Sequence, residues 1–152
     1  MALGHIFDIA GSGMNAQSLR LNTTASNLAN AQSASSSADE VYRNRQPVFA
    51  AIQRQAMAAM KSGNGFDNGF AAPDDVGAGV QVLGVVESDA PLQRRYEPDH
   101  PQADEEGYVF YPNVNPVEEM TNMISASRSF QMNVEVMNSA KQMVQRVLTL
   151  GQ

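Results

Sequence analysis

The chain has 152 residues, enough for one compact domain or a small domain with extensions, and its formal net charge is -6. The negative charge does not attract phosphate, so we expect no nucleic-acid partner. The absence of cysteine excludes disulfides, thiolate metal sites and cysteine nucleophiles. No stretch approaches the ~20 apolar residues of a membrane span, and the first residues lack the basic and apolar regions of a cleaved signal peptide.

The first element is a helix predicted over residues 3–31. Apolar or small residues recur there at alternating spacings of three and four, the pattern of a coiled-coil seam. Glycines at positions 4, 11 and 13 each cost about 1 kcal/mol relative to alanine, so this helix needs neighbours to order it. The alternative is an ordinary amphipathic helix folded onto its own domain. The seam positions are Leu3, Phe7, Ala10, Met14, Gln17, Leu21, Thr24, Leu28 and Ala31.

The middle of the chain predicts short extended elements. Residues 32–39 are small and polar and predict a loop. Residues 41–52 predict an edge strand or extended arm, because proline 47 cannot donate a hydrogen bond to a central ladder. Residues 53–62 predict a short helix, and residues 76–88, with valines alternating around glycines, predict two short strands or one bulged strand. Two Asn-Gly turns lie between them, without the ligand spacing of a calcium loop.

Residues 89–115 combine prolines with acidic residues and predict an extended path rather than regular structure. They contain His100, one of only two histidines, close to Asp104, Glu105 and Glu106. A hydrolase built on this histidine and these acids is one hypothesis, but neither His5 nor His100 has a second ligand or a serine nucleophile at useful spacing. We therefore expect a surface histidine in a turn, no catalytic site, no metal and no cofactor.

The C-terminal stretch predicts a second helix, over residues 116–151. Pro116 suits the first helical position, Glu118 and Glu119 suit the positive end of the helix dipole, and Gly151 suits the C-terminal cap. Such a helix is roughly 50 Å long, too long to bury its apolar stripe against so small a body, so we expect partner helices. The seam comprises Met120, Met123, Ser127, Phe130, Val134, Met137, Lys141, Val144 and Leu148, widened by Ile124, Ala126, Ala140 and Val147.

Three stretches resemble a known family. The segment Ser26–Ala31, SNLANA, resembles the N-terminal signature of flagellar rod and hook axial proteins. Residues 96–152 are similar nearly throughout to the C-terminal part of proximal rod members of that family, and YRNRQPVF at residues 42–49 agrees with them, whereas residues 53–78 show little similarity. One departure concerns the turn after the signature, where many relatives have Thr-x-Gly-Tyr. Here Ala31 is followed by a serine-rich insert and Val41-Tyr42.

The resemblance implies a structural subunit of the flagellar basal-body rod. Its expected fold is mainly α, with long N- and C-terminal helices (1–31 and 116–152) paired as a coiled coil and a small β-rich, extended middle region (32–115). Expected partners are copies of itself, proximal and distal rod subunits, the protein at the junction of rod and export gate, and the flagellar type III export apparatus. We expect it in the periplasmic rod, exported without a cleaved signal, with no membrane insertion.

The residues expected to make the interfaces are those of the two seams. Asn27 and Asn30 are expected to act as helix-end or interhelical hydrogen-bonding groups, and the abundant methionines suit packing on several different neighbours. A soluble coiled-coil adaptor or secretion chaperone that does not polymerise is the alternative, and it would fold as a stable helical dimer. The interface set is Phe7, Met14, Leu21, Asn27, Leu28, Asn30, Met120, Met123, Phe130, Val134, Met137, Val144 and Leu148.

Overall fold

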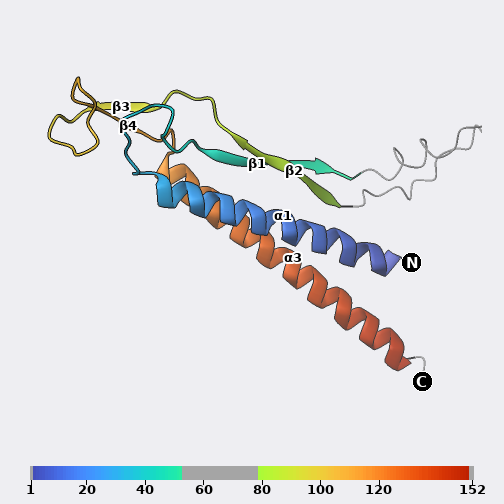
Figure 1. Ribbon diagram of the computed structural model, residues 1–152. Coiled ribbons are helices and arrows are strands. Elements are labelled where there is room, and N and C mark those ends of the chain that lie inside the picture. Colours follow the sequence, from blue (N-terminus) through green and yellow to red (C-terminus); the bar gives the residue numbers. More distant parts are fainter. Residues whose placement is uncertain (1, 53–78, 151–152) are drawn as a thin grey trace, which may run out of the picture. The chain divides into compact units, whose positions relative to one another are not determined.

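The structure is a computed structural model that describes residues 2–52 and 79–150. It contains two long helices and four short strands (Figure 1). The chain divides into two compact units, each built from separate stretches of sequence. Unit 1 comprises Met1–Ala16, Phe49–Leu83 and Ser129–Gln152, and unit 2 comprises Gln17–Val48 and Gly84–Arg128.

The two long helices confirm the helices expected from the apolar periodicity. Helix α1 runs from Ala2 to Asn30 and helix α3 from Pro116 to Leu150, so Pro116 does take the first helical position. The side chain of Asn115 caps α3, because its Oδ1 accepts a hydrogen bond from the backbone N–H of Val117 at 3.1 Å. The expected cap at Gly151 and the expected helix at 53–62 lie outside the described residues.

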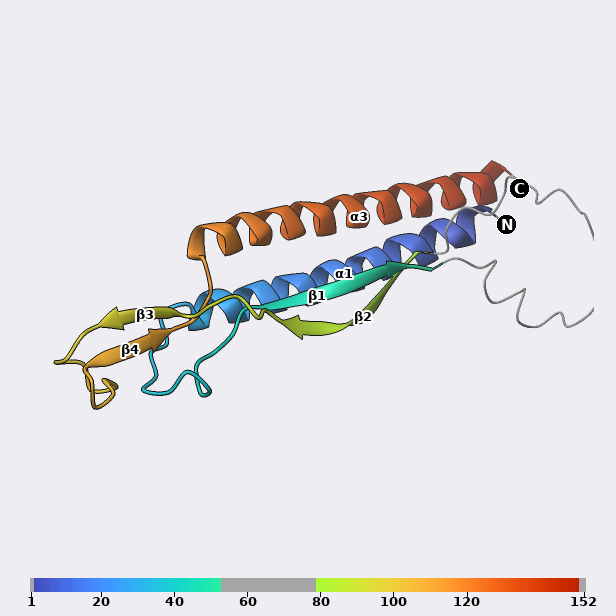
Figure 2. The ribbon, with the colours of Figure 1, turned by 90° about the horizontal axis from the view of Figure 1, so that it is seen from above.

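Strands β1 (Arg45–Ala51) and β2 (Val80–Glu87) form a two-stranded sheet, and they run alongside each other in both views (Figures 1 and 2). Hydrogen bonds at the two ends, Ile52 N to Gly79 O and Ser88 N to Asn44 O, make the pair antiparallel. Asn44 and Ile52, on the β1 side, are eight positions apart, whereas Gly79 and Ser88, on the β2 side, are nine positions apart. The extra residue is consistent with the bulged-strand prediction for residues 76–88.

The prediction that residues 89–115 follow an extended path without regular structure is wrong. They form an antiparallel hairpin of β3 (Gln93–Tyr96) and β4 (Tyr108–Tyr111), with Gln93 opposite Tyr111 and Tyr96 opposite Tyr108. Prolines surround these strands but do not enter them, which is why the proline count was misleading. An isolated bridge between Ser35 and Phe110 adds a contact on β4. Within unit 2, this bridge connects the loop expected at residues 32–39 to β4.

The buried apolar side chains of the described residues are small. They are four alanines, three valines and Pro112, and none is a leucine, isoleucine, methionine or phenylalanine. Unit 2 holds Val41, Val109, Val114 and Ala126, and unit 1 holds Ala10, Ala16 and Ala140. Larger apolar residues usually supply most of the burial that stabilises a domain. Neither unit therefore has a large apolar core within the described part of the chain.

Candidate assembly surfaces

Unit 2 is organised around the buried side chain of Asn27, near the C-terminal end of α1. Its amide nitrogen donates to Asn44 Oδ1 and to the Arg45 carbonyl, both at 2.8 Å, and to Glu119 Oε2 at 3.1 Å. Its amide oxygen accepts from the Tyr42 hydroxyl at 2.8 Å and from the Arg45 backbone N–H at 3.0 Å. One side chain thus joins the end of α1, the arm at 42–45 and the start of α3. We call these five residues the Asn27 cluster.

Asn44 and Asn113 extend this cluster into the rest of unit 2. Asn44 donates from its side chain to Glu119 Oε1 at 3.3 Å, and its backbone N–H donates to Asn113 Oδ1 at 2.8 Å. The amide nitrogen of Asn113 donates in turn to the carbonyls of Ser88 and Ala90. A chain of side-chain amides therefore fixes the segments before β1, after β2 and before α3.

The helix dipole accounts for an acidic residue at position 119, but it does not predict that Glu119 is a buried hydrogen-bond acceptor. Its neighbour Glu118 is exposed, whereas Glu119 is 2% exposed and accepts hydrogen bonds from two asparagine side chains. Asn30, by contrast, bonds within its own helix, donating to the Ser26 carbonyl at 2.8 Å. The sequence signal for Glu119 is its spacing of seven residues from Ala126, which is also buried.

The stretch that departs from the Thr-x-Gly-Tyr pattern brings its tyrosine to Asn27. The Tyr42 hydroxyl donates to Asn27 Oδ1 at 2.8 Å and lies 3.2 Å from the hydroxyl of Ser26. The sequence did not mark Tyr42 or Asn44 as a partner of Asn27. Their only signal was their place within the stretch that resembles the axial proteins.

The seam residues expected on α1 lie at least partly inside the subunit. Ala10 and Thr24 of the seam are buried, and of the expected interface residues on α1 Asn27 is buried and the other five are half-buried. In unit 2, Arg20 donates to Asn122 Oδ1 at 3.1 Å, a second side-chain bond between α1 and α3. Because residue numbers rise along one helix as they fall along the other, these segments of α1 and α3 are antiparallel. The half-buried members are Phe7, Met14, Leu21, Leu28 and Asn30.

The seam expected on α3 is only partly the face that the subunit buries. Met123, Phe130, Val134, Met137 and Val144 are half-buried, but Met120 and Leu148 are 50% and 68% exposed. The fully buried positions are Ala126 and Ala140, which were expected to widen the seam, and Glu119; they lie one residue before Ser127, Lys141 and Met120. Small or hydrogen-bonding residues thus occupy one column of the inward face. A rule that counts large apolar residues shifts this column by one position.

A flank of α3 in unit 1 exposes large apolar side chains to solvent. At about 100° per residue, its members lie within roughly 60° of one another around the helix. Their exposed fractions run from 49% to 65%. Contiguous exposed apolar residues of this kind mark a protein-interaction surface more often than isolated ones do. We call this surface the α3 flank: Met132, Val136, Met143 and Val147.

The histidine and acidic residues considered as catalytic or metal-binding candidates do not form a common site within the described residues. His100 lies in a turn of unit 2, where its Nδ1 accepts a hydrogen bond from the backbone N–H of Gln102 at 3.1 Å, while Asp104 accepts from the N–H groups of Glu106 and Tyr108. Within residues 2–52 and 79–150, no group of three histidines or acids is spaced to hold a metal. Neither described helix is long and apolar enough to cross a membrane.

Comparison with known proteins gives matches at both ends of the chain and over its full length. A family model described as flagella basal body rod protein matches residues 7–32, and one described as flagellar basal body rod FlgEFG protein C-terminal matches residues 105–150. The first match covers Asn27, and the second covers Glu119. The matched regions therefore include these two helix residues of the Asn27 cluster, while Tyr42, Asn44 and Arg45 lie between them.

Three relatives that match over essentially their full length share one name. The flagellar basal-body rod protein FlgC of Salmonella typhimurium strain LT2 is 48% identical over all of both chains, and that of Escherichia coli O157:H7 is 49% identical over all of both chains. The FlgC protein of Borreliella burgdorferi is 34% identical over all of this chain and 99% of the relative. The chain therefore belongs to the FlgC family of flagellar basal-body rod proteins.

Proposed function

We propose that the chain is a structural subunit of the bacterial flagellar basal-body rod and that its two terminal helices join it to neighbouring subunits. In this role the helices form part of the shaft that transmits torque and of the wall of the export channel. The observation that carries the proposal is the small size of the buried apolar side chains in the described residues, alanines, valines and one proline, beside the exposed methionines and valines of the α3 flank. Large apolar side chains that a subunit leaves exposed are available to its neighbours.

The size of the α3 flank favours a many-sided assembly over a stable dimer. Four side chains of this type bury at most about 500 Å² of apolar surface in total. A stable pairwise interface needs roughly 800 Å² from each partner. One such contact is therefore weak in isolation, and several different neighbours must contribute at once. Exposed apolar residues of α3 in unit 2 add to the available surface: Val117, Met120 and Ile124.

The proposed interface consists of the seam residues of both helices together with the α3 flank, in a coiled-coil-like arrangement of α1 and α3. The proposed partners are copies of this chain, other proximal and distal rod subunits and the protein at the junction with the export gate. The chain would reach the periplasmic rod through the flagellar type III export apparatus, without a cleaved signal. Support comes from the relatives, whose names describe rod proteins and no enzymatic activity.

A charge placed on the α3 flank tests this proposal. Met143→Asp puts a carboxylate into the proposed subunit contact, where it costs several kcal/mol of desolvation unless it is paired. Gln142→Asp, at the adjacent exposed position on another side of the helix, is the matched control. In a flagellated host lacking its own copy, the Met143 variant should be absent from purified basal bodies and the cells non-motile, while the Gln142 variant supports motility.

The same experiment distinguishes the adaptor hypothesis. An adaptor or chaperone would be a stable helical dimer in solution, and the wild-type chain would not be found in purified basal bodies. Light scattering of the purified wild-type protein gives its mass directly. A monomer that enters basal bodies supports the rod subunit, and a dimer that never enters them rejects it.

A further inference from the structure

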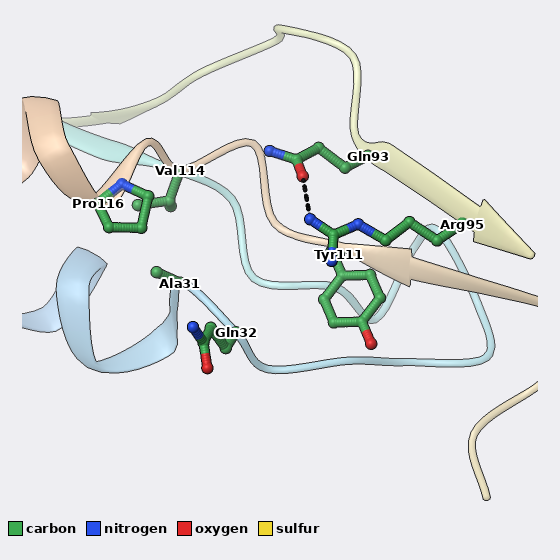
Figure 3. Close-up of a pocket in the computed structure, with 7 residues that line it drawn as sticks. All are labelled: Ala31, Gln32, Gln93, Arg95, Tyr111, Val114 and Pro116. Atoms are coloured by element: carbon green, nitrogen blue, oxygen red, sulfur yellow. Dashed lines mark hydrogen bonds between the residues drawn. The ribbon is translucent and has the colours of Figure 1, made fainter. Parts of the chain in front are cut away.

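A pocket of about 380 Å³ lies within unit 2, between the hairpin and the helix ends. Figure 3 shows Arg95 and Tyr111 on one side of it and Ala31, Val114 and Pro116 on the other. The apolar wall comes from the residues just after α1 and at the start of α3. The pocket thus combines one cationic group with two glutamines and an apolar wall, a combination suited to an acidic side chain with an apolar stem.

Arg95 is oriented into this pocket by neutral groups. Its guanidinium donates to Gln93 Oε1 at 3.2 Å and lies 4.8 Å from the centre of the Tyr111 ring. Two other strand arginines have carboxylate partners, Arg45 with Glu87 at 2.8 Å and Arg94 with Glu106 at 3.2 Å. Within the described residues, no carboxylate oxygen lies within 4.0 Å of the Arg95 nitrogens.

The nearest candidate within the same hairpin is already engaged. Glu97 accepts a hydrogen bond from the Tyr111 hydroxyl at 3.0 Å, and this bond raises the pKa of Tyr111 above its ordinary value. The phenol therefore stays neutral at physiological pH. Neither Tyr111 nor Gln93 supplies the negative charge that the exposed guanidinium of Arg95 can pair with.

A complementary surface exists elsewhere on the same chain. The loop at residues 97–106, between β3 and β4, contains five acidic residues and no lysine or arginine. Glu97, Asp104 and Glu106 are occupied by Tyr111, by backbone N–H groups and by Arg94. Asp99 and Glu105 are exposed, and the described part of the chain provides neither of them with a hydrogen-bond or ion-pair partner. We call this stretch the acidic loop.

We propose that the pocket beside Arg95 receives a carboxylate of the acidic loop of a second copy of this chain. The proposal rests on the proposed function, because it needs copies that meet in an assembly. Pocket and loop are different surfaces of one chain, so the contact is heterologous and continues from copy to copy in a ring or a helical array. Charge complementarity favours the loop, since five of its ten residues are acidic and none is a lysine or arginine, while Arg95 has no carboxylate partner within the described residues.

Cysteine cross-linking tests the contact without background, because the chain contains no cysteine. Two single variants are expressed together: Gln32→Cys on the pocket rim, and either Asp99→Cys or Glu105→Cys in the acidic loop. A disulfide dimer between the two can form only between copies. We expect this dimer in purified basal bodies after mild oxidation. Co-expression of Asn22→Cys, at an exposed position of α1 away from the pocket lining, with the same loop variant is the control and should give no dimer.

Charge reversal provides the second arm. Added to the pocket-rim variant, Arg95→Glu should abolish the cross-linked dimer, and Arg94→Gln, on the opposite face of β3, should leave it intact. The other copy can then carry Glu105→Arg with Asp99→Cys, or Asp99→Arg with Glu105→Cys. Either combination should restore the cross-linked dimer with the copy that carries Arg95→Glu. Absence of any dimer from chains that are present in basal bodies overturns the contact while leaving the rod function in place. Absence of the wild-type chain from basal bodies rejects the rod function itself.

Discussion

Asn27 of α1 donates a hydrogen bond to Glu119 of α3 at 3.1 Å, and the two side chains are 1% and 2% exposed. Ninety-two positions separate them in sequence, so within unit 2 this bond joins a segment of α1 to a segment of α3. A buried carboxylate is costly unless donors surround it, and here the side-chain amides of Asn27 and Asn44 supply them. The pair therefore selects one relative position of the two helix segments, as buried polar groups do in coiled coils.

The first prediction concerns the removal of Asn27. Asn27→Ala deletes five hydrogen bonds and leaves Glu119, Tyr42 and the Arg45 backbone N–H without this partner. We expect the free energy of unfolding to fall by about 3 kcal/mol, the range for buried polar groups that lose their partners. Urea denaturation followed by circular dichroism measures it. Asn22→Ala, on an exposed position of α1, should change stability by less than about 0.5 kcal/mol. Equal effects of the two substitutions would contradict the importance of the cluster.

The second prediction separates two glycines of α1. A Cβ built on Gly11 meets no atom within 4 Å, whereas one on Gly13 lies 2.9 Å from Asn133 Nδ2. Gly11→Ala should raise stability by about 0.5–1 kcal/mol through helix propensity. Gly13→Ala should gain less, because the Asn133 side chain has to move. Thermal melts of the two variants give the order, and a larger gain at position 13 would show that Asn133 does not lie against Gly13.

The third prediction concerns pH. The hydrogen bond to Glu97, followed by burial and by the charge of that carboxylate, raises the pKa of Tyr111 above 10.0, although Arg95 lowers it somewhat. Because the folded pKa is raised, the stabilising contribution is complete below the phenol's ordinary pKa and is lost as pH rises through the raised one. Glu97→Ala should shift the last tyrosinate absorbance step to lower pH. Glu105→Ala, at an exposed position of the same loop, should leave that step in place. An unchanged titration in both variants would show that Glu97 does not control this phenol.

The fourth prediction returns to the seam. Phe130 is half-buried on α3, and Phe130→Asp introduces a carboxylate that costs several kcal/mol if it stays ionised in an apolar contact. We expect loss of motility and loss of the protein from basal bodies. Gln131→Asp, at the next and exposed position, should be tolerated. Normal swimming of the Phe130 variant would remove this residue from the proposed interface.

Local patterns predicted the long elements well. The three–four spacing of apolar residues gave both helices to within about two residues at each described end, and Pro116 marked the start of α3. Pro47 indicated an edge strand, and within the described residues β1 pairs with one strand, β2. These features depend on neighbouring residues in the sequence, which is why the sequence alone carries them.

Contacts between distant segments could not be predicted in the same way. The β3–β4 hairpin forms because tyrosines and arginines pair across it, with Arg94 lying 3.7 Å from the centre of the Tyr108 ring, while the nearby prolines indicate irregular structure. From the sequence, Glu119 is interpreted only through the helix dipole. Its hydrogen-bond partner Asn27 is far away in sequence, so local patterns do not reveal the contact. The resemblance to axial proteins indicated that the stretch around Asn27 mattered but gave no partner for it.

In the proposed function, the α3 flank contacts other subunits in the rod. A photo-crosslinking amino acid placed at Val136, at the centre of that flank, tests it directly in purified basal bodies. We predict covalent adducts between this chain and copies of itself or other rod proteins, and no adducts from the same group placed at Gln142. A Val136 variant that enters basal bodies and supports motility, yet gives no adduct after irradiation, would contradict the claim.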